Sequence, residues 1–272
     1  MKISISRTAS VNLKKIFWDI FFRLKNRGVS LERHFPWLKG TSTEAIFFEA
    51  TKLSVSVGGL VLREIRYLID KKELKIGLIG LVCVVPESRG IGVAGELLKE
   101  AIAYAKKHGF DFLTLWTNQH KIYLPHGFYL MDTWCFGWVD ASSKQKNAKA
   151  DLSFQSHIFV ENRTRPLPPF ADSIYEYSVG NISFTLLNDK DGAVVVWHEG
   201  EVTEVAHAMI EVFPARWRLN VVKDDPLIHA LASCGANVDV CPVNLQMWLN
   251  LEHSDPSGNQ VSRIKMSVLD RI

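Results

Sequence analysis

The stretch PESRGIGVAGELL, residues 86–98, places three glycines and one arginine between an apolar run and a helical pattern. The N–H groups in the first turn of a helix have no partner within the helix, and the helix dipole is positive there. Glycines let a backbone approach a phosphate closely, and an arginine adds a charged fork of donors. On these grounds alone, the stretch is either an ordinary tight turn or an anion-binding turn.

The segments around this stretch exclude two common phosphate-binding motifs. A Walker loop is excluded because no Gly-Lys-Ser or Gly-Lys-Thr follows the glycines. A dinucleotide-binding turn opens a strand–helix–strand unit, whereas a meander of strands comes first here. The expected strands are EAIFFEA (44–50), LSVSVGGLVLREIRYLI (53–69) and LKIGLIGLVCVVP (74–86). An amphipathic helix over 92–109 and a further strand over 110–116 should follow.

Two motifs in this region together resemble the acetyl-CoA-binding core of the GNAT superfamily of N-acetyltransferases. In that family an apolar strand ending in Val is followed by four residues, Gln or Arg, two residues, Gly, one residue, and Gly or Ala. Here the strand ends at Val84, and VPES leads into RGIGVA at 89–94. The family also places a Tyr four residues before a Gly-Phe pair, as Tyr123 stands before the pair at 127–128. The resemblance implies a GNAT fold for residues 1–140, an α+β architecture in which helices flank a central mixed, mostly antiparallel sheet.

The resemblance also implies roles for single residues. Tyr123 would protonate the departing thiolate, and Asn118 would make a minor cofactor contact. The backbones of Val82 and Val84 would pair with the pantetheine arm as an added strand does, and the Val82 N–H would meet the carbonyl oxygen. The turn would cradle the CoA pyrophosphate with the N–H groups of Arg89, Gly90, Ile91, Gly92, Val93 and Ala94.

A general base is harder to assign, because the strand at 74–86 contains no carboxylate and no histidine. Glu49 and Glu64, on the preceding strands, are the candidates, acting through water, and each also fits a solvated carboxylate. His120 and His126 lie close to Tyr123 in sequence and fit either a proton-transfer role or ordinary surface and packing roles. Aromatic side chains that either wall an acceptor pocket or belong to the core are Phe35, Trp37 and Tyr67.

The composition describes a globular chain of one large or two ordinary domains, with 272 residues, 47% hydrophobic and 22% charged. The 32 basic and 29 acidic residues give a net charge of +3, with no long run of Lys and Arg, which argues against a nucleic-acid partner. None of the four cysteines forms a C-x-x-C pair, so no metal site is expected. Because we find no signal peptide and no run of about 20 apolar residues, we expect a cytoplasmic protein with no membrane partner.

The second half of the chain repeats the first half as a pattern. A hairpin, a helix, a strand, a helix and closing strands follow one another in both halves, which indicates an internal duplication. The polar stretch ASSKQKNAKAD, at 141–151, is typical of a linker. The expected organisation is a GNAT catalytic domain at 1–140, a linker at 141–170 and a degenerate GNAT-like α/β domain at 171–272.

The second domain lacks the cofactor motif. Its turn HEGE, at 198–201, has neither the Arg nor the Gly-x-Gly/Ala pattern, and Leu231 stands four residues before Gly235 where a Tyr is expected. Cofactor binding should therefore fail there, and this domain would shape the acceptor site or form a subunit interface, which leaves a homo-oligomer open. The tandem arrangement resembles the enhanced-intracellular-survival type acetyltransferases, although this chain has no room for their third domain.

Three functions are compatible with these motifs. The first is an acetyl-CoA-dependent N-acetyltransferase, without a metal, that acts on a small-molecule or protein amine. The second is a non-catalytic CoA-binding or interaction module, which the missing carboxylate on the cofactor strand favours. The third is transfer of a longer acyl group, for which Gly77 and Gly80 would leave space.

Overall fold

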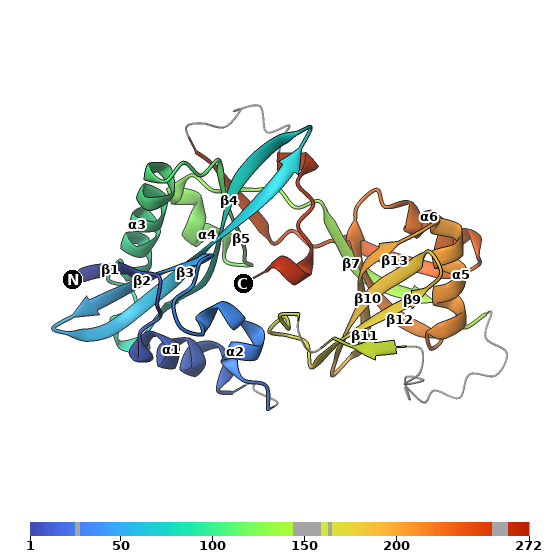
Figure 1. Cartoon of the computed structure of the whole chain (residues 1–272), viewed down its shortest axis with the longest axis horizontal. Helices are drawn as coiled ribbons and strands as arrows, with labels where there is room; N and C mark the ends of the chain where they lie inside the picture. The colour runs from blue at the N-terminus through green and yellow to red at the C-terminus, as the bar shows by residue number, and fades with distance from the viewer. Residues whose placement is uncertain (25–27, 144–158, 163–164, 252–260, 272) are drawn as a thin grey trace. The chain divides into compact units, whose positions relative to one another are not determined.

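The described residues form two compact units, each built around one seven-stranded sheet (Figure 1). The structure is a computed structural model, and it describes residues 1–24, 28–143, 159–162, 165–251 and 261–271. Unit 1 comprises Met1–Asp132, Asn244–Ile264 and Arg271–Ile272, and unit 2 comprises Thr133–Val243 and Lys265–Asp270. The expected fold class, a mixed α/β chain with two related sheets, is confirmed.

The sheet of unit 1 has the strand order β1-β2-β3-β4-β5-β14-β6. Its strands are β1 (Lys2–Ser6), β2 (Ala45–Lys52), β3 (Val55–Ile69), β4 (Lys72–Val84), β5 (Phe112–Trp116), β6 (Tyr129–Leu130) and β14 (Gln246–Asn250). Neighbouring strands are antiparallel except β4 and β5, which are parallel and are joined by the helix α3 (Val93–Lys107). A parallel pair needs such a crossover, so the two strands predicted on either side of the helix become neighbours.

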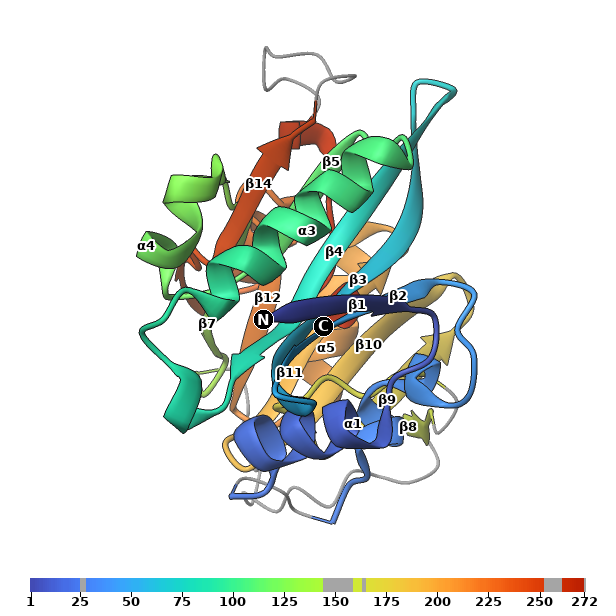
Figure 2. The same ribbon diagram turned by 90° about the vertical axis from the view of Figure 1, so that its left-hand side faces the viewer.

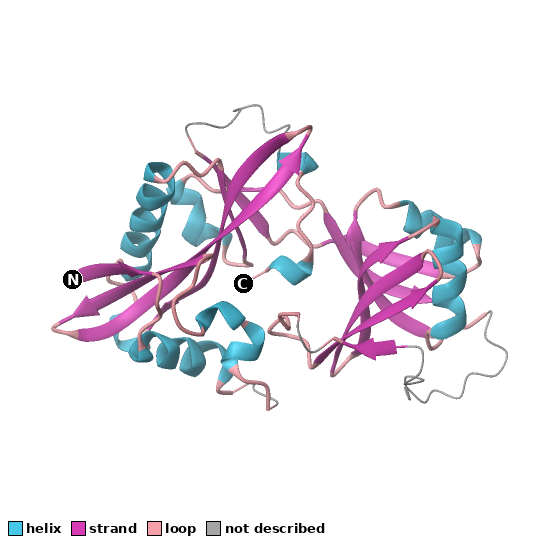
Figure 3. Cartoon of the chain, viewed as in Figure 1, coloured by secondary structure: helices cyan, strands magenta, loops and turns pink. Residues whose placement is uncertain are grey.

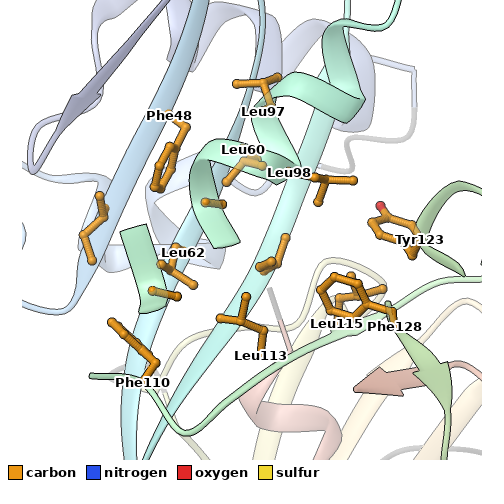
Figure 4. Close-up of a cluster of buried hydrophobic side chains, with 14 of the residues drawn as sticks. Phe48, Leu60, Leu62, Leu97, Leu98, Phe110, Leu113, Leu115, Tyr123 and Phe128 are labelled. Carbon is orange, nitrogen blue, oxygen red and sulfur yellow. The ribbon is translucent and has the colours of Figure 1, made fainter. Parts of the chain in front are cut away.

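Helices cover both faces of this sheet (Figures 1 and 2). On one face, Leu97, Leu98 and Ala101 of α3 are fully buried against β2, β3, β4 and β5. Figure 4 shows Leu97 and Leu98 among the side chains of this core. On the other face lie α1 (Val11–Phe17), the π-helical turn η1 (Trp18–Phe22), α2 (Leu31–His34) and η2 (Pro36–Leu38). Successive side chains of a strand point to opposite faces, and the central strands carry consecutive buried apolar residues, so each face has its own core.

The first helix begins directly after Ser10. The Ser10 side chain accepts a hydrogen bond from the Leu13 N–H at 3.0 Å, which satisfies one free donor of the first turn. Leu13 itself packs so close to β3 that a Cβ on Gly59 would lie 2.4 Å from its Cδ1 atom. The glycine therefore lets α1 approach the sheet at the position where a larger residue would push it away.

The sheet of unit 2 has the strand order β13-β7-β12-β11-β10-β9-β8. Its strands are β7 (Trp134–Asp140), β8 (Phe159–Glu161), β9 (Ser173–Val179), β10 (Ile182–Asp189), β11 (Gly192–Glu199), β12 (Arg216–Val222) and β13 (Asn237–Pro242). Figure 3 shows α5 (Val202–Val212) and α6 (Pro226–Ser233) on one face of this sheet, where their apolar side chains meet those of the strands. The parallel pair β11 and β12, joined by α5, matches β4 and β5, joined by α3, which supports the expected duplication.

Each half of the chain contributes one strand to the sheet that the other half mainly forms. In unit 1, β14 from the end of the chain lies between β5 and β6, and in unit 2, β7 from the first half lies between β12 and β13. The closing strands of each half, β6 and β7 in the first and β13 and β14 in the second, therefore do not pair with each other, because the two members enter different sheets. The sequence predicts contiguous segments, namely a domain at 1–140, a linker at 141–170 and a domain at 171–272. Because of the exchange, each of the two units is instead made of separate stretches of the chain. Much of the expected linker, at 144–158 and 163–164, lies outside the described residues.

Within the described residues, no helix combines the length and the apolar character needed to cross a membrane.

Candidate active site

A slot opens in the sheet of unit 1 where β4 and β5 diverge. The two strands pair only from Ile76 to Leu78 on β4, which face Phe112 to Thr114 on β5. Beyond Leu78, β4 continues to Val84 and stays paired with β3 alone among the described strands. A register shift in the β3–β4 ladder accompanies Leu81, whose φ of +50° is unusual for a residue with a side chain. A bulge of this kind bends the strand that carries it, and here it lies just beyond the point where the β4–β5 pairing ends.

The end of β4 presents backbone groups to this slot. The Val85 N–H donates to the Val57 carbonyl on β3 at 2.9 Å, so the backbone groups of Val84 point to the opposite side. There the Val84 carbonyl accepts a hydrogen bond from Arg89 Nε at 3.1 Å. This contact ties the turn to the strand, while the Arg89 side chain remains exposed.

The glycine-rich turn leaves the N-terminus of α3 open. Gly92 is the N-cap with a φ of +86°, and no side chain caps the helix. Gly90 is also left-handed, with a φ of +77°, and a Cβ at either glycine would meet no atom within 4 Å. The first N–H groups of this fifteen-residue helix therefore receive no side-chain cap, which is the arrangement that can bind a phosphate.

The slot and the turn form one cavity of about 310 Å³. Its walls include Ile20 and Phe21 from η1, Ile122 and Tyr123 from α4 (His120–Tyr123), and the residues Val82, Cys83, Val84, Ser88, Arg89, Gly90, Gly92, Val93, Ala94 and Gly95. Three parts of the chain far apart in sequence thus meet at one site.

Tyr123 contributes a buried aromatic side chain with a hydroxyl group to this cavity. Its side chain is 8% exposed, and its ring packs edge-on against Phe128 with the centroids 6.0 Å apart. Figure 4 shows the hydroxyl oxygen pointing away from Phe128. Burial raises the pKa of Tyr123 to about 12, so the hydroxyl keeps its proton at neutral pH.

Cys83 also lines the cavity and is 5% exposed. Burial raises the pKa of its thiol to about 12, against the opposing effects of a hydrogen bond with Gly59 and of the Arg89 charge. The thiol therefore stays protonated and is a poor nucleophile.

The two predicted carboxylates do not line the cavity. Glu49 accepts hydrogen bonds from Ser10 Oγ at 2.9 Å and from Ser56 Oγ, so it supports the N-cap of α1. Glu64 pairs with Lys75 at 3.1 Å and with Arg66 at 3.4 Å. Lys75 in turn donates to the carbonyl of His108, at the C-terminal end of α3, so Glu64 belongs to the end of the helix remote from the turn.

Three other predicted polar residues lie near the motif but outside the cavity lining. Asn118 is exposed and accepts a hydrogen bond from Gln119 Nε2. His126 lies against α3 beside Gly95, and burial together with the Lys99 charge lowers its pKa. His120 begins α4, and its Nε2 atom is buried.

The structure also decides between the aromatic alternatives. Phe35 and Trp37 are 1% and 6% exposed and belong to the core under α1 and α2, so they do not wall a pocket. Tyr67 pairs with Leu74 near the β3–β4 turn and is not among the cavity residues.

The space expected beside Gly77 is filled, because a Cβ there would lie 2.5 Å from a Leu113 methyl carbon and 2.6 Å from one of Leu62.

Sequence reasoning missed Ile20 and Phe21, which enter the cavity from η1. Their apolar spacing predicts only a helix that faces the core. The π-helical turn in which both residues lie has no clear sequence signal.

In unit 2 the equivalent turn is closed by the chain itself. Glu201 is the N-cap of α5, and its carboxylate accepts a hydrogen bond from the Glu204 N–H at 2.9 Å. The backbone donors of Glu204 and Thr203 lower the pKa of Glu201, so the helix N-terminus already holds an anion. A Cβ on Gly200 would lie 2.7 Å from the Asn181 carbonyl oxygen, so this turn has no open space above it.

In unit 2, a side-chain contact also links the end of β11 to the start of α6. His198, near the end of β11, contacts both carboxylate oxygens of Asp225 at 3.1 Å, and Asp225 caps α6. Burial acts to raise the pKa of Asp225, but the hydrogen bonds from His198 and the Leu227 N–H outweigh it and lower the pKa. The geometry therefore gives a physical reason for the expected loss of cofactor binding in this unit.

Comparisons with known proteins agree with this geometry. A family model described as an acetyltransferase (GNAT) domain matches residues 42–131. A search of curated proteins found no match to this chain.

Solved structures resemble the chain over almost its whole length. A GCN5-related N-acetyltransferase from Anabaena variabilis is 12% identical, with a TM-score of 0.59 over 91% of this chain and 72% of that chain. A GCN5-related N-acetyltransferase from Kribbella flavida is 10% identical, with a TM-score of 0.60 over 91% and 70%. Eis1 from Mycobacterium abscessus is 10% identical, with a TM-score of 0.59 over 92% and 73%. At these identities the likeness shows the fold.

Proposed function

From the match of residues 42–131 to a family model described as an acetyltransferase (GNAT) domain, we propose that the chain transfers an acetyl group from acetyl-CoA to an amine. One observation carries the proposal: a helix N-terminus without a side-chain cap, a strand edge that β5 leaves unpaired and a buried, protonated tyrosine line the same cavity. The first can hold a phosphate, the second can pair with an extended amide arm, and the third can donate a proton.

Each part of the cavity has a role in binding. The N–H groups from Gly90 to Ala94 hold the pyrophosphate, with the Arg89 guanidinium as an added charge. The Arg89 N–H, which the sequence also assigned to the phosphates, instead donates to the Pro86 carbonyl at 3.3 Å. Val82 and Val84 offer backbone groups to the pantetheine arm along the side of β4 that β5 leaves unpaired. Ile20 and Phe21 close the apolar side of the slot and limit water there.

The chemical step uses few protein groups. Acetyl-CoA supplies the thioester carbonyl that the amine attacks. Tyr123 protonates the departing thiolate, and the Val82 N–H donates to the carbonyl oxygen as charge develops on it. Because neither Glu49 nor Glu64 lines the cavity, the amine enters in its neutral form and passes its proton to water.

A non-catalytic CoA-binding module is the second candidate. It is favoured by one observation: the cavity residues that the structure describes include no carboxylate and no histidine. Transfer of a longer acyl group has less support, since the side chains of Leu113 and Leu62 fill the space beside Gly77. Turnover with acetyl-CoA and with longer acyl-CoAs separates the three functions.

Titration of the chain with acetyl-CoA tests the cofactor site. We expect one molecule bound per chain, because the turn of unit 2 is closed by Glu201. The Arg89→Glu variant should weaken binding by at least about 100-fold, since it replaces a charge-assisted donor by a repelling charge. Lys107→Glu, which makes the same charge change at the far end of α3, is the control and should bind normally. No binding by the unmodified chain would remove the proposal, and two molecules per chain would contradict the closed second site.

The pH dependence of turnover tests the assignment of proton transfers. Because burial raises the pKa of Tyr123 to about 12, the acid stays protonated and kcat/KM should have no falling limb below about pH 11. The rate should rise with pH, by up to about tenfold per unit, as the amine loses its proton. Glu49→Gln should keep the same profile within about threefold, whereas a true general base contributes about 100-fold or more. A falling limb near pH 9, or a profile changed by Glu49→Gln, would contradict the assignment.

A further inference from the structure

Buried nitrogen donors without partners gather at the C-terminal end of β5. Trp116 Nε1 and the Nε and Nη2 atoms of Arg271 are inaccessible to solvent, and none has a hydrogen-bond partner among the described residues. The Arg271 guanidinium lies over the Trp116 ring, 5.5 Å from its centroid. Both residues belong to unit 1, although they are far apart in sequence.

The charge of Arg271 is only partly balanced. Burial lowers the pKa of Arg271 to about 10, and the nearby Asp132 carboxylate opposes this shift. Asp132 Oδ2 already accepts hydrogen bonds from the N–H groups of Leu245 and Gln246, at 2.8 Å and 3.0 Å. A buried cation with unpaired donors costs free energy that a bound anion would offset.

The position of this cluster relates it to the slot. On β5, Leu113 and Leu115 belong to the core under α3, so Trp116, which alternates with them, faces the other side of the sheet. The pairing of β4 with β5 ends at Thr114, and Trp116 lies two residues further, about 7 Å along the strand. The donors therefore lie beside the slot, on the face opposite α3.

We propose that Arg271 and Trp116 bind the carboxylate of the acceptor, so that the acceptor is an amine carrying a carboxylate, such as an amino acid. This deepens the proposed function and rests on it, because the slot beside the cluster is the one assigned to acetyl-CoA. The Nε–H and Nη2–H bonds of a guanidinium point in parallel, so one edge meets both oxygens of a carboxylate. The Trp116 N–H supplies a third donor to the same anion.

Thermal unfolding of the full chain tests the proposal without any need for turnover. The probes are the twenty standard amino acids and the corresponding amino acid amides, which keep the amine and lack the carboxylate. Binding to the folded chain raises its Tm. We expect at least one amino acid to raise the Tm more than its amide does, and Arg271→Gln to weaken that binding by about 10- to 100-fold.

The matched control is Arg263→Gln. Arg263 is another arginine near the C-terminus, but it is exposed and pairs with Asp70 at 2.6 Å and 2.7 Å, so its loss should leave amino acid binding unchanged. If Arg271→Gln does not fold, Trp116→Phe decides, because it removes only the N–H and keeps the ring under the guanidinium. Trp116→Phe should weaken binding by about three- to tenfold.

Two results would overturn the proposal. One is that no amino acid raises the Tm of the unmodified chain more than its amide, and the other is that the variants keep that difference. Titration of the same samples with acetyl-CoA tells this failure from failure of the proposed function. Normal acetyl-CoA binding without amino acid binding would leave the cofactor site intact and remove the carboxylate site.

Discussion

A fragment comprising residues 1–140 should not fold, although it contains every motif of the cofactor site. It lacks β14, whose residues Met247 and Trp248 are 0% and 1% exposed in the core of unit 1 and whose neighbour Leu251 is 2% exposed. Burial of such side chains contributes about 1.5–3 kcal/mol each, so their loss removes roughly 5–9 kcal/mol. That is comparable to the whole stability of a typical domain.

Loss of β14 also leaves β5 and β6 with unpaired edges, and loss of β12 and β13 leaves β7 without a sheet. Circular dichroism and size-exclusion chromatography of the fragment should therefore show aggregation or an unfolded chain.

Co-expression of residues 1–143 with residues 159–272 is the matched control for this prediction. Each piece supplies the strand that the other lacks, so together they should form a folded heterodimer that binds acetyl-CoA. A folded fragment 1–140, with cooperative unfolding on its own, would show that the exchanged strand is dispensable.

Tyr123→Phe should lower kcat by about 100- to 10,000-fold while leaving the Kd for acetyl-CoA within about threefold. The variant loses only the proton that the thiolate needs. It keeps the ring that packs against Phe128, and it leaves no described hydrogen-bond partner of the hydroxyl unsatisfied. Thiol release with an amine found by screening measures kcat, and calorimetric titration measures the Kd.

Phe128→Leu is the control for packing effects near this site. It should lower the Tm, because it trims a side chain that is 2% exposed, but it should change kcat far less than Tyr123→Phe does. A Tyr123→Phe variant with kcat within about threefold of the unmodified chain would assign the proton to water and leave Tyr123 as a wall of the cavity.

Much of the fold could be predicted from local patterns. The strands β2, β3 and β4, the turn at 86–94 and α3 all lie close to where the sequence predicts them. Each of these features depends on residues within a few positions of one another, so its physical cause is local. The Gly58-Gly59 pair is a further local signal of close approach.

The candidate site was predictable only in part. The glycine turn and Tyr123 carry their own spacing, and the structure brings both to one cavity. The two base candidates follow only from the presence of a carboxylate on a neighbouring strand. Residue type alone does not determine which end or which face of a sheet a side chain reaches. Glu49 accepts hydrogen bonds from Ser10 and Ser56 and so supports the start of α1. Ion pairs hold Glu64 near the C-terminal end of α3.

By itself, the sequence determined the elements of this protein and the chemistry of its turn, because helix caps, strand alternation and glycine conformations act over short distances. Only the tertiary structure decided which strand completes which sheet. β7 and β14 occupy matching places in the two sheets, so their alternating patterns suit either place, and pairing between distant segments selects the partner. The same long-range pairing brings the end of the chain to β5, where Arg271 meets Trp116.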